Sequence, residues 1–252
     1  MSIKLVISGS CGRMGRAIAQ CALKDSVFAL GAALEAEHHE AIGCDYGSIL
    51  GQPLKGGLTV TGDADDALRH GDVLIEFTAP EPTLAHAKLA EKLRKPMVIG
   101  TTGLSERQLA VLRRAARAIP MVVSPNMSLG VNVLFELAAL AAARLDAAYD
   151  IEVVESHHRH KKDAPSGTAK RLIDVLVAAR KRQAGSIPVH AIRAGDIVGD
   201  HMVILAGPSE RVELTHRAQS RDVFAQGALR AARFVARHRP GLYDMSHVLR
   251  GS

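Results

Sequence analysis

Residues 3–15 read IKLVISGSCGRMG, an apolar run that leads into three evenly spaced glycines. The residues after it place Ile18, Ala19 and Ala22 at helical spacing. A strand, a glycine turn and a helix in this order are typical of dinucleotide-binding folds. The glycines permit a tight turn and let backbone N–H groups at the helix start approach a pyrophosphate. Because the spacing is G-x-x-G-x-x-G and not the commoner G-x-G-x-x-G, the motif needs support from its context.

An acidic residue farther along the chain gives such support. A second predicted strand, from Phe28 to Leu34, leads directly into Glu35, which lies 20 positions after Gly15 (35 minus 15). An acid at about this spacing holds the adenosine ribose hydroxyls in dinucleotide-binding folds. The alternative is an exposed glutamate at the end of a strand, with no ligand.

Strands and helices continue to alternate up to residue 127. Apolar strands are predicted at residues 72–77, 97–99 and 121–123, and helices at 82–94 and 105–118. This alternation predicts an α/β fold with a Rossmann-like, doubly wound parallel sheet, whose ligands bind beyond the carboxyl ends of the strands. The predicted cofactor-binding residues lie in the glycine turn and at these ends: Gly9, Ser10, Cys11, Gly12, Arg13, Met14, Glu35, Phe77, Gly100, Thr101, Thr102, Ser124, Pro125, Asn126 and Met127.

The pattern changes after residue 127. A helix at 131–145 is followed by a strand at 151–156, a helix at 168–181, three strand candidates at 189–194, 202–206 and 211–216, and a helix at 220–237. Neighbouring strands with flanking helices predict a second, α+β domain with a mixed or antiparallel sheet.

The stretch 155–168, ESHHRHKKDAPSGT, has a composition that no packed core requires. His157 and Lys161 are candidate proton donors. An imidazole titrates near neutrality, and a lysine crowded by Arg159 and Lys162 loses its proton more easily.

The end of the same stretch has the features of a helix start. Ser166 is placed to act as the N-cap of the helix at 168–181. Gly167 and Thr168 would then offer backbone N–H groups at a helix N-terminus, where a carboxylate or a phosphate binds readily. The whole stretch therefore points to an anionic small molecule.

Two other functions fit parts of this stretch. His-His-x-His resembles a set of metal ligands, but no cysteine or paired carboxylate completes it, so no metal is predicted. A basic loop could bind nucleic acid, and the net charge of +6 fits that partner as well as an anionic cofactor and substrate. Aromatic residues make up only 3% of the chain and none lies in the stretch, so nucleic acid is not the expected partner.

The cysteine content and the apolar segments predict where in the cell the protein is located. The three cysteines, Cys11, Cys21 and Cys44, are odd in number and do not resemble a disulfide framework. The first predicted strand begins close to Met1, with no room for a signal peptide, and no apolar segment is long enough to span a bilayer. We expect reduced thiols, a cytoplasmic location and no membrane association.

Several motifs together resemble one family, the 4-hydroxy-tetrahydrodipicolinate reductases, also called dihydrodipicolinate reductases. The resemblance covers essentially the whole chain, and the two blocks within 155–168 are the most specific part of it. The matching segments are residues 9–15, Glu35, 77–80, 100–103, 126–132, 155–168, 193–199 and 240–245.

The resemblance implies an oxidoreductase of the diaminopimelate route to lysine that uses NADH or NADPH. It implies His157 as proton donor and acceptor, Lys161 as a second proton donor, and His158, Gly167 and Thr168 as ligands of a cyclic dicarboxylate. It also implies a dinucleotide-binding domain of residues 1–127 and 239–252. Residues 128–238 would bind substrate, build a homotetramer and close on the first domain about hinges near 127 and 238.

The preferred cofactor is a separate question. Glu35 and Glu37 would repel a 2′-phosphate and Ala36 offers no cation, which favours NADH, whereas Arg13, His38 and His39 could bind that phosphate. We expect use of both cofactors with a modest preference for NADH. The rival functions are another two-domain dehydrogenase with a similar nucleotide half, and a non-enzymatic redox sensor or nucleic-acid-binding protein with a Rossmann core.

Overall fold

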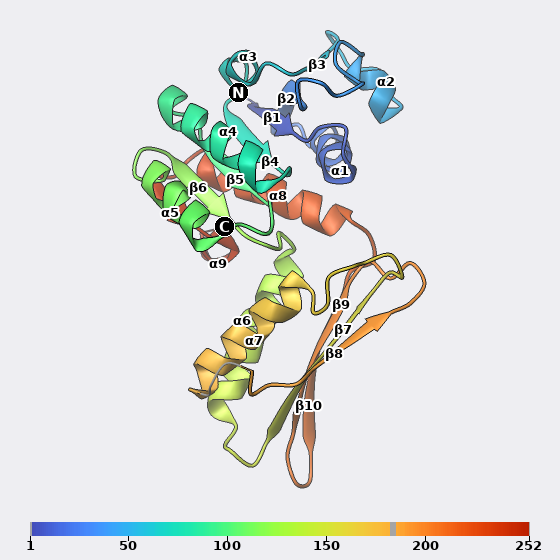
Figure 1. The fold of residues 1–252 in the computed structure, drawn as a ribbon, viewed down its shortest axis with the longest axis vertical. Helices are drawn as coiled ribbons and strands as arrows, with labels where there is room; N and C mark the ends of the chain where they lie inside the picture. Colours follow the sequence, from blue (N-terminus) through green and yellow to red (C-terminus); the bar gives the residue numbers. More distant parts are fainter. Residues whose placement is uncertain (1, 182–184, 252) are drawn as a thin grey trace. The chain divides into compact units, whose positions relative to one another are not determined.

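The computed structural model describes residues 2–181 and 185–251 of the chain. Contacts between residues divide it into two units, one up to Met127 together with the residues from Phe224 onward, and one of Ser128–Val223. Figure 1 shows the two units, each with its own sheet. Among the described residues, no helix has the length and apolar character needed to cross a membrane.

The first unit has a seven-stranded sheet in the order β11-β6-β5-β4-β1-β2-β3, and every neighbouring pair is parallel. This confirms the predicted doubly wound fold. The strands are β1 (Ile3–Ser8), β2 (Phe28–Leu34), β3 (Val60–Thr61), β4 (Val73–Glu76), β5 (Met97–Ile99), β6 (Pro120–Val123) and β11 (Gly241–Tyr243). The helices are α1 (Arg13–Ala22), α2 (Tyr46–Leu50), α3 (Ala64–Arg69), α4 (Pro80–Leu93), α5 (Glu106–Ala115), α8 (Asp222–Val235) and α9 (Met245–Arg250).

The core of this unit explains why its strands carry uninterrupted apolar runs. Leu74, Ile99 and Met121, from three neighbouring strands, are fully buried and belong to one cluster with residues of the covering helices. Strands buried on both faces have no polar side to alternate with. Helix α5 begins with a capping box formed by Ser105 and Gln108.

In contrast to the sequence prediction, most of helix α8 lies with the first unit, from Phe224, and not with the second. Gly227 explains this close packing, because a Cβ placed there would lie 1.8 Å from the backbone oxygen of Met127. A glycine at this position lets α8 approach the end of β6. The chain thus returns to the first unit near residue 224 and not at residue 239.

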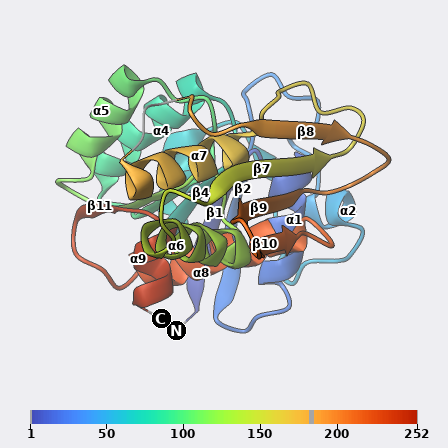
Figure 2. The same ribbon diagram turned by 90° about the horizontal axis from the view of Figure 1, so that it is seen from below.

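The second unit has a mixed four-stranded sheet in the order β10-β9-β7-β8, in which only β7 and β8 run parallel. Its strands are β7 (Asp150–His157), β8 (Val189–Arg193), β9 (Asp200–Ala206) and β10 (Arg211–Arg217). Helices α6 (Leu129–Arg144) and α7 (Gly167–Arg180) lie side by side and cover one face, where they bury Ile151, Val153 and Val203 (Figure 2). This is the α+β domain that the sequence predicts.

Candidate active site

The glycine turn of the first unit is closely packed. Gly9 has a φ of 74°, and a Cβ on it would lie 2.8 Å from the carbonyl oxygen of Phe77. A Cβ on Gly15 would lie 2.2 Å from the carbonyl oxygen of Gly9. The N-cap of α1 is Gly12, so no side chain caps this helix and its N-terminus stays suited to a phosphate. Only glycine fits at positions 9 and 15 of the turn.

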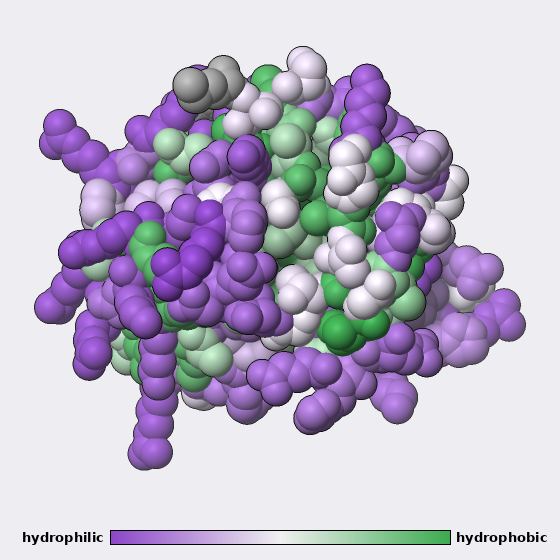
Figure 3. Space-filling model, turned by 90° about the horizontal axis from the view of Figure 1, so that it is seen from above, coloured by the Kyte–Doolittle hydropathy of each residue, from purple (hydrophilic) through white to green (hydrophobic). Residues whose placement is uncertain are grey.

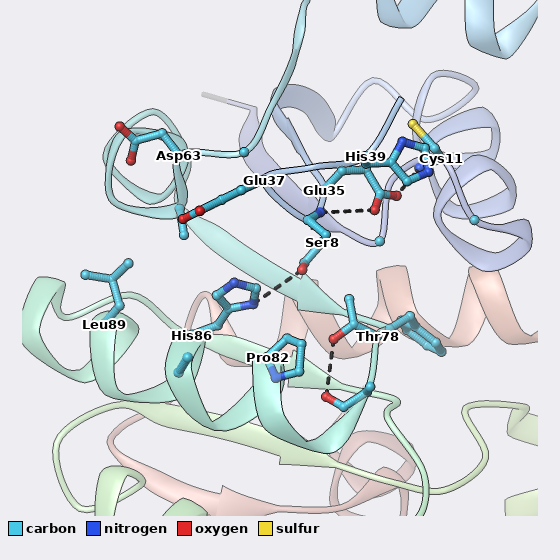
Figure 4. Close-up of a pocket in the computed structure, with 18 of the residues that line it drawn as sticks. Ser8, Cys11, Glu35, Glu37, His39, Asp63, Thr78, Pro82, His86 and Leu89 are labelled. Carbon is cyan, nitrogen blue, oxygen red and sulfur yellow. Dashed lines mark hydrogen bonds between the residues drawn. The ribbon is translucent and has the colours of Figure 1, made fainter. Parts of the chain in front are cut away.

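A cavity of about 1250 Å³ opens beside this turn. Figure 4 shows it between the ends of β1, β2 and β4 and the helix α4, with Glu35 and Cys11 on one side and His86 and Pro82 on the other. The Glu35 carboxylate accepts a hydrogen bond from the backbone N–H of Cys11 at 2.7 Å, which ties the acid to the glycine turn. Of the predicted cofactor-binding residues, those that line the cavity are Gly9, Cys11, Gly12, Glu35 and Phe77.

The other predicted cofactor-binding residues lie outside this lining. Gly100 packs on the ring of Phe77, and the Thr101 hydroxyl is 3.3 Å from the backbone N–H of Thr78. Gly100, Thr101 and Thr102 follow β5, and residues 124–127 follow β6, at the sheet edge where β4 also ends. Ser10, Arg13 and Met14 belong to the turn and the start of α1 without lining the cavity.

Four carboxylates line the cavity, of which only Glu35 was a predicted ligand. Figure 4 shows Glu37 and Asp63 across from His86 and Leu89, and Asp65 and His39 also belong to the lining. Asp63 and Asp65 come from the start of α3, which β3 brings beside the end of β2. The surface that carries α2 and α3 is mostly hydrophilic around a smaller hydrophobic region (Figure 3).

A buried acid contacts two of the lining residues, His86 and Thr78. Glu76 is fully buried, its carboxylate lies 2.6 Å from Nδ1 of His86, and it accepts a hydrogen bond from the Thr78 hydroxyl. Glu76 lies within the apolar strand predicted at residues 72–77. Its partner His86, ten positions later on α4, had no signal of its own.

In the second unit, His157 is the last residue of β7 and is buried. Its Nδ1 is hydrogen-bonded to the carboxylate of Glu155. Burial lowers the pKa of His157 below its ordinary value, although the Glu155 carboxylate opposes the shift. His158 follows at the strand end, half-buried.

Lys161 has a partner that the sequence analysis did not anticipate. Its Nζ lies 2.8 Å from Oδ1 of Asp163, so a carboxylate pairs with the ammonium. Crowding by Arg159 and Lys162 stays a prediction. Burial raises the pKa of Asp163, but the hydrogen bond and the charge of Lys161, together with the charge of Arg193 and a backbone hydrogen bond, outweigh burial and leave this pKa below its ordinary value.

The predicted helix start is confirmed. The Ser166 hydroxyl accepts a hydrogen bond from the backbone N–H of Ala169 at 3.1 Å, and α7 begins at Gly167. A Cβ on Gly167 would have no neighbour within 4 Å, so the space in front of this helix end is open. The Ser166 backbone N–H donates to Glu155 at 3.2 Å, which connects the helix end with the His157 partner.

The described residues contain no group of three or more His, Cys, Asp and Glu side chains placed to hold a metal ion. The proton-transfer candidates and the helix end lie in the second unit, and the cavity beside the glycine turn lies in the first.

Known proteins similar to this chain agree with this division. The family described as "Dihydrodipicolinate reductase, N-terminus" matches residues 3–127, and "Dihydrodipicolinate reductase, C-terminus" matches residues 130–249. The 4-hydroxy-tetrahydrodipicolinate reductase of Magnetococcus marinus is 46% identical over 266 residues, covering 99% of each chain. The protein of the same name from Nitrosospira multiformis is 45% identical, covering 98% of each chain.

Solved structures show the same fold. The dipicolinate-bound dihydrodipicolinate reductase from Paenisporosarcina sp. TG-14 superposes with a TM-score of 0.79 at 24% identity, covering 97% of this chain and 98% of that one. An amine dehydrogenase from Mycobacterium smegmatis superposes with a TM-score of 0.64 at 12% identity, covering 96% and 94%. Other two-domain dehydrogenases therefore share the architecture, and the sequence separates them. With both halves matched by the family and full-length relatives above 40% identity, the chain belongs to the dihydrodipicolinate reductases.

Proposed function

We propose that the chain reduces 4-hydroxy-tetrahydrodipicolinate to tetrahydrodipicolinate with NADH or NADPH, in the diaminopimelate route to lysine, and that it does so in the cytoplasm. The observation that carries the proposal is the connection between two groups of the second unit. Glu155 accepts hydrogen bonds both from His157 and from the N-cap of α7, so a proton-transfer group and an anion-binding helix end lie close together. Oxidation of NADH that depends on freshly generated substrate tests the proposal.

The first unit fits a dinucleotide. The turn residues Gly9–Met14 would hold the pyrophosphate, because side chains at Gly9 or Gly15 would collide with backbone atoms. Glu35 would hold the adenosine ribose, and residues 77, 100–102 and 124–127 would line the path of the nicotinamide half. When bound, the reduced nicotinamide supplies the hydride.

The second unit supplies charge and protons. Loss of the substrate hydroxyl leaves a conjugated cyclic imine, and reduction at C4 requires one proton on the ring in addition to the hydride. His157 or Lys161 delivers this proton. His158 and the backbone N–H groups of Gly167 and Thr168 hold a carboxylate, which the positive end of the helix dipole stabilises.

The lining of the cavity supports a preference for NADH. Glu35, Glu37, Asp63 and Asp65 all face the space beside the expected ribose, while Arg13 does not line the cavity. A 2′-phosphate would meet like charges there. His39 also lines the cavity, and its Nδ1 accepts a hydrogen bond from the Ala41 N–H at 3.1 Å, so this nitrogen is not directed at a 2′-phosphate.

We expect kcat/KM to be modestly higher with NADH than with NADPH at about pH 8, and relative NADPH use to rise towards about pH 6, because a phosphate monoester loses part of its negative charge near its second pKa of about 6. Replacing Glu37 by Gln and Asp63 by Asn should raise kcat/KM for NADPH by roughly two- to fivefold per charge, since exposed charge interactions contribute about 0.2–1 kcal/mol. The control is Glu40→Gln, outside the cavity. A strong NADPH preference at the higher pH would show that Arg13 outweighs the carboxylates.

The outward face of the second sheet supports self-assembly. Val154, Met202 and Ile204 point away from α6 and α7, and Ile192 on the edge strand β8 is 46% exposed. Apolar side chains on the outward face of a sheet are commonly covered by another copy of the chain. We propose a homotetramer built on this face.

Light scattering after size exclusion should therefore give four times the mass of one chain. Ile204→Glu should lower this mass, because it places a charge in the proposed interface. Val133→Glu should leave it unchanged, since Val133 is also exposed (41%) but lies on α6, on the other side of the sheet. A monomeric wild-type protein at micromolar concentration would contradict the proposal.

A further inference from the structure

Glu155 is a buried acid that has no role in the sequence analysis or in the proposed proton transfer. Its side chain is fully buried on the helix-covered face of β7. Both oxygens accept hydrogen bonds: Oε1 from Nη2 of Arg193 at 2.7 Å and from Ser166 N–H at 3.2 Å, and Oε2 from Nη1 of Arg193 at 2.9 Å and from His157 Nδ1. A buried carboxylate is costly unless it is paired in this way.

Arg193 fixes the carboxylate in position. The guanidinium binds both oxygens of Glu155 and also donates to the backbone oxygen of Asp163 at 2.7 Å. Burial raises the pKa of Glu155, but the hydrogen bonds from Arg193 and His157 outweigh burial and keep this pKa below its ordinary value. Glu155 is therefore ionised in the neutral pH range and can only accept hydrogen bonds.

The ionised state of Glu155 determines which nitrogen of the His157 ring carries a proton. An acceptor at Nδ1 requires a proton on Nδ1, in the neutral imidazole as well as in the imidazolium. The proton that is gained and lost is then the one on Nε2. A carboxylate beside a histidine orients the ring and stabilises its charged form.

The space beside Nε2 is open because residue 199 is a glycine. A Cβ on Gly199 would lie 3.1 Å from Nε2 of His157 and 3.4 Å from Cδ2. The φ of Gly199 lies outside the left-handed range, so the backbone itself would accept alanine. Access to the His157 ring therefore explains the glycine at position 199, and backbone conformation does not.

We propose that Glu155, held by Arg193, is a positioning residue that keeps the proton of neutral His157 on Nδ1, so that only Nε2 exchanges a proton with the substrate, and that Gly199 keeps the approach to Nε2 open. The inference rests on the proposed function for its substrate. The tautomer itself can be measured without turnover.

Four charged or titratable groups face His157. Glu155 lies on its own strand, Arg193 on β8, His201 on β9 and Lys161 in the following loop. The rings of His157 and His201 are 5.2 Å apart. Burial lowers the pKa of His201 to about 3, so His201 stays neutral while His157 titrates. Lys161 and Arg193 disfavour the imidazolium, and Glu155 is the one acid among the four groups that favours it.

The direct test is ¹⁵N NMR of histidine-labelled protein, with the His157 signals assigned from a His157→Gln sample. Above its titration, wild-type His157 should carry its proton on Nδ1, and a proton on Nε2 would overturn the proposal without any further variant. In Glu155→Gln the preference should be lost, because an amide can donate as well as accept. An unchanged tautomer in that variant would also overturn the proposal.

A matched control is available on the same strand. Glu152 lies on the outward face of β7 and pairs with Nε2 of His190 at 2.7 Å, so Glu152→Gln breaks a Glu–His contact of the same kind. It should leave the His157 signals unchanged. If both substitutions changed them equally, Glu155 would be acting through general stability of the sheet.

The pH dependence gives a second readout. Without the Glu155 charge the imidazolium loses its stabilising acid, so the pKa of His157 should fall further, by about one unit or more. If protonated His157 donates the ring proton, kcat declines as pH rises through this pKa, and in Glu155→Gln the decline moves to lower pH. A decline that stays in place would count against the positioning role.

Gly199→Ala tests access to Nε2 of His157 separately from the tautomer of this ring. Its methyl group would crowd Nε2, so kcat should fall by roughly a hundredfold, the scale of a displacement of about 1 Å at a reacting group. The NMR signals should still show the proton on Nδ1, and NADH affinity should not change. Full activity in Gly199→Ala would refute the role of the open space.

Discussion

Replacing His157 by alanine should lower kcat by about two orders of magnitude or more, while NADH binding stays nearly intact. The ring is buried at the end of β7 with Nδ1 bound to Glu155, so Nε2 is left to exchange a proton. Steady-state kinetics with a calorimetric NADH titration measures both quantities. The control is His190→Ala, a histidine of the same unit that also pairs with a glutamate but is mostly exposed.

Lys161→Ala should lower kcat on the same scale, because Lys161 is the second candidate for delivering the ring proton. Its neighbour Lys162 is exposed and gives the matched control, since Lys162→Ala removes the same charge one residue away. Wild-type turnover in both His157→Ala and Lys161→Ala would remove the proposed acid–base pair. Equal losses in the Lys161 and Lys162 variants would mean that the charge of the loop matters and not the position of one ammonium.

Thr168→Pro should weaken competitive binding of pyridine-2,6-dicarboxylate by roughly one to two orders of magnitude. Thr168 is the second residue of α7, where proline fits the helix but cannot donate a backbone N–H. A hydrogen bond to a charged group contributes about 1.5–3 kcal/mol, which corresponds to this loss. Calorimetry in the presence of NADH measures it.

Two controls sharpen this test. Arg107 is the second residue of α5, which has its own serine cap, so Arg107→Pro makes the same backbone change at an unrelated helix start. Thr168→Val removes only the hydroxyl group. Undiminished binding in Thr168→Pro would place the carboxylate elsewhere, and a loss in Thr168→Val alone would assign it to the side chain.

The sequence was most informative where local chemistry decides the structure. Continuous apolar runs predicted the buried parallel strands, and Ser166 predicted the start of α7. It missed β3 and β11, with two and three residues, because such short strands show no periodicity and exist only through pairing with β2 and β6.

Long-range contacts in the site could not be predicted from the sequence. Glu155 and Arg193 are 38 positions apart and meet because β7 and β8 pair in parallel, with His157 opposite Arg193. Asp63 reaches the cavity only because β3 joins β2. At Lys161 the sequence analysis considered the flanking cations but not the acid two positions away, with which the structure pairs the ammonium.

The central claim is that this chain reduces its substrate, the cyclic dicarboxylate 4-hydroxy-tetrahydrodipicolinate, with a nicotinamide cofactor. The most direct measurement follows NADH absorbance after purified protein is added to freshly generated substrate, with pyridine-2,6-dicarboxylate as competitor. The account predicts oxidation of one NADH for each substrate molecule, formation of tetrahydrodipicolinate, and inhibition that excess substrate reverses. If folded protein that binds NADH leaves both NADH and NADPH unoxidised with this substrate, the claim is contradicted.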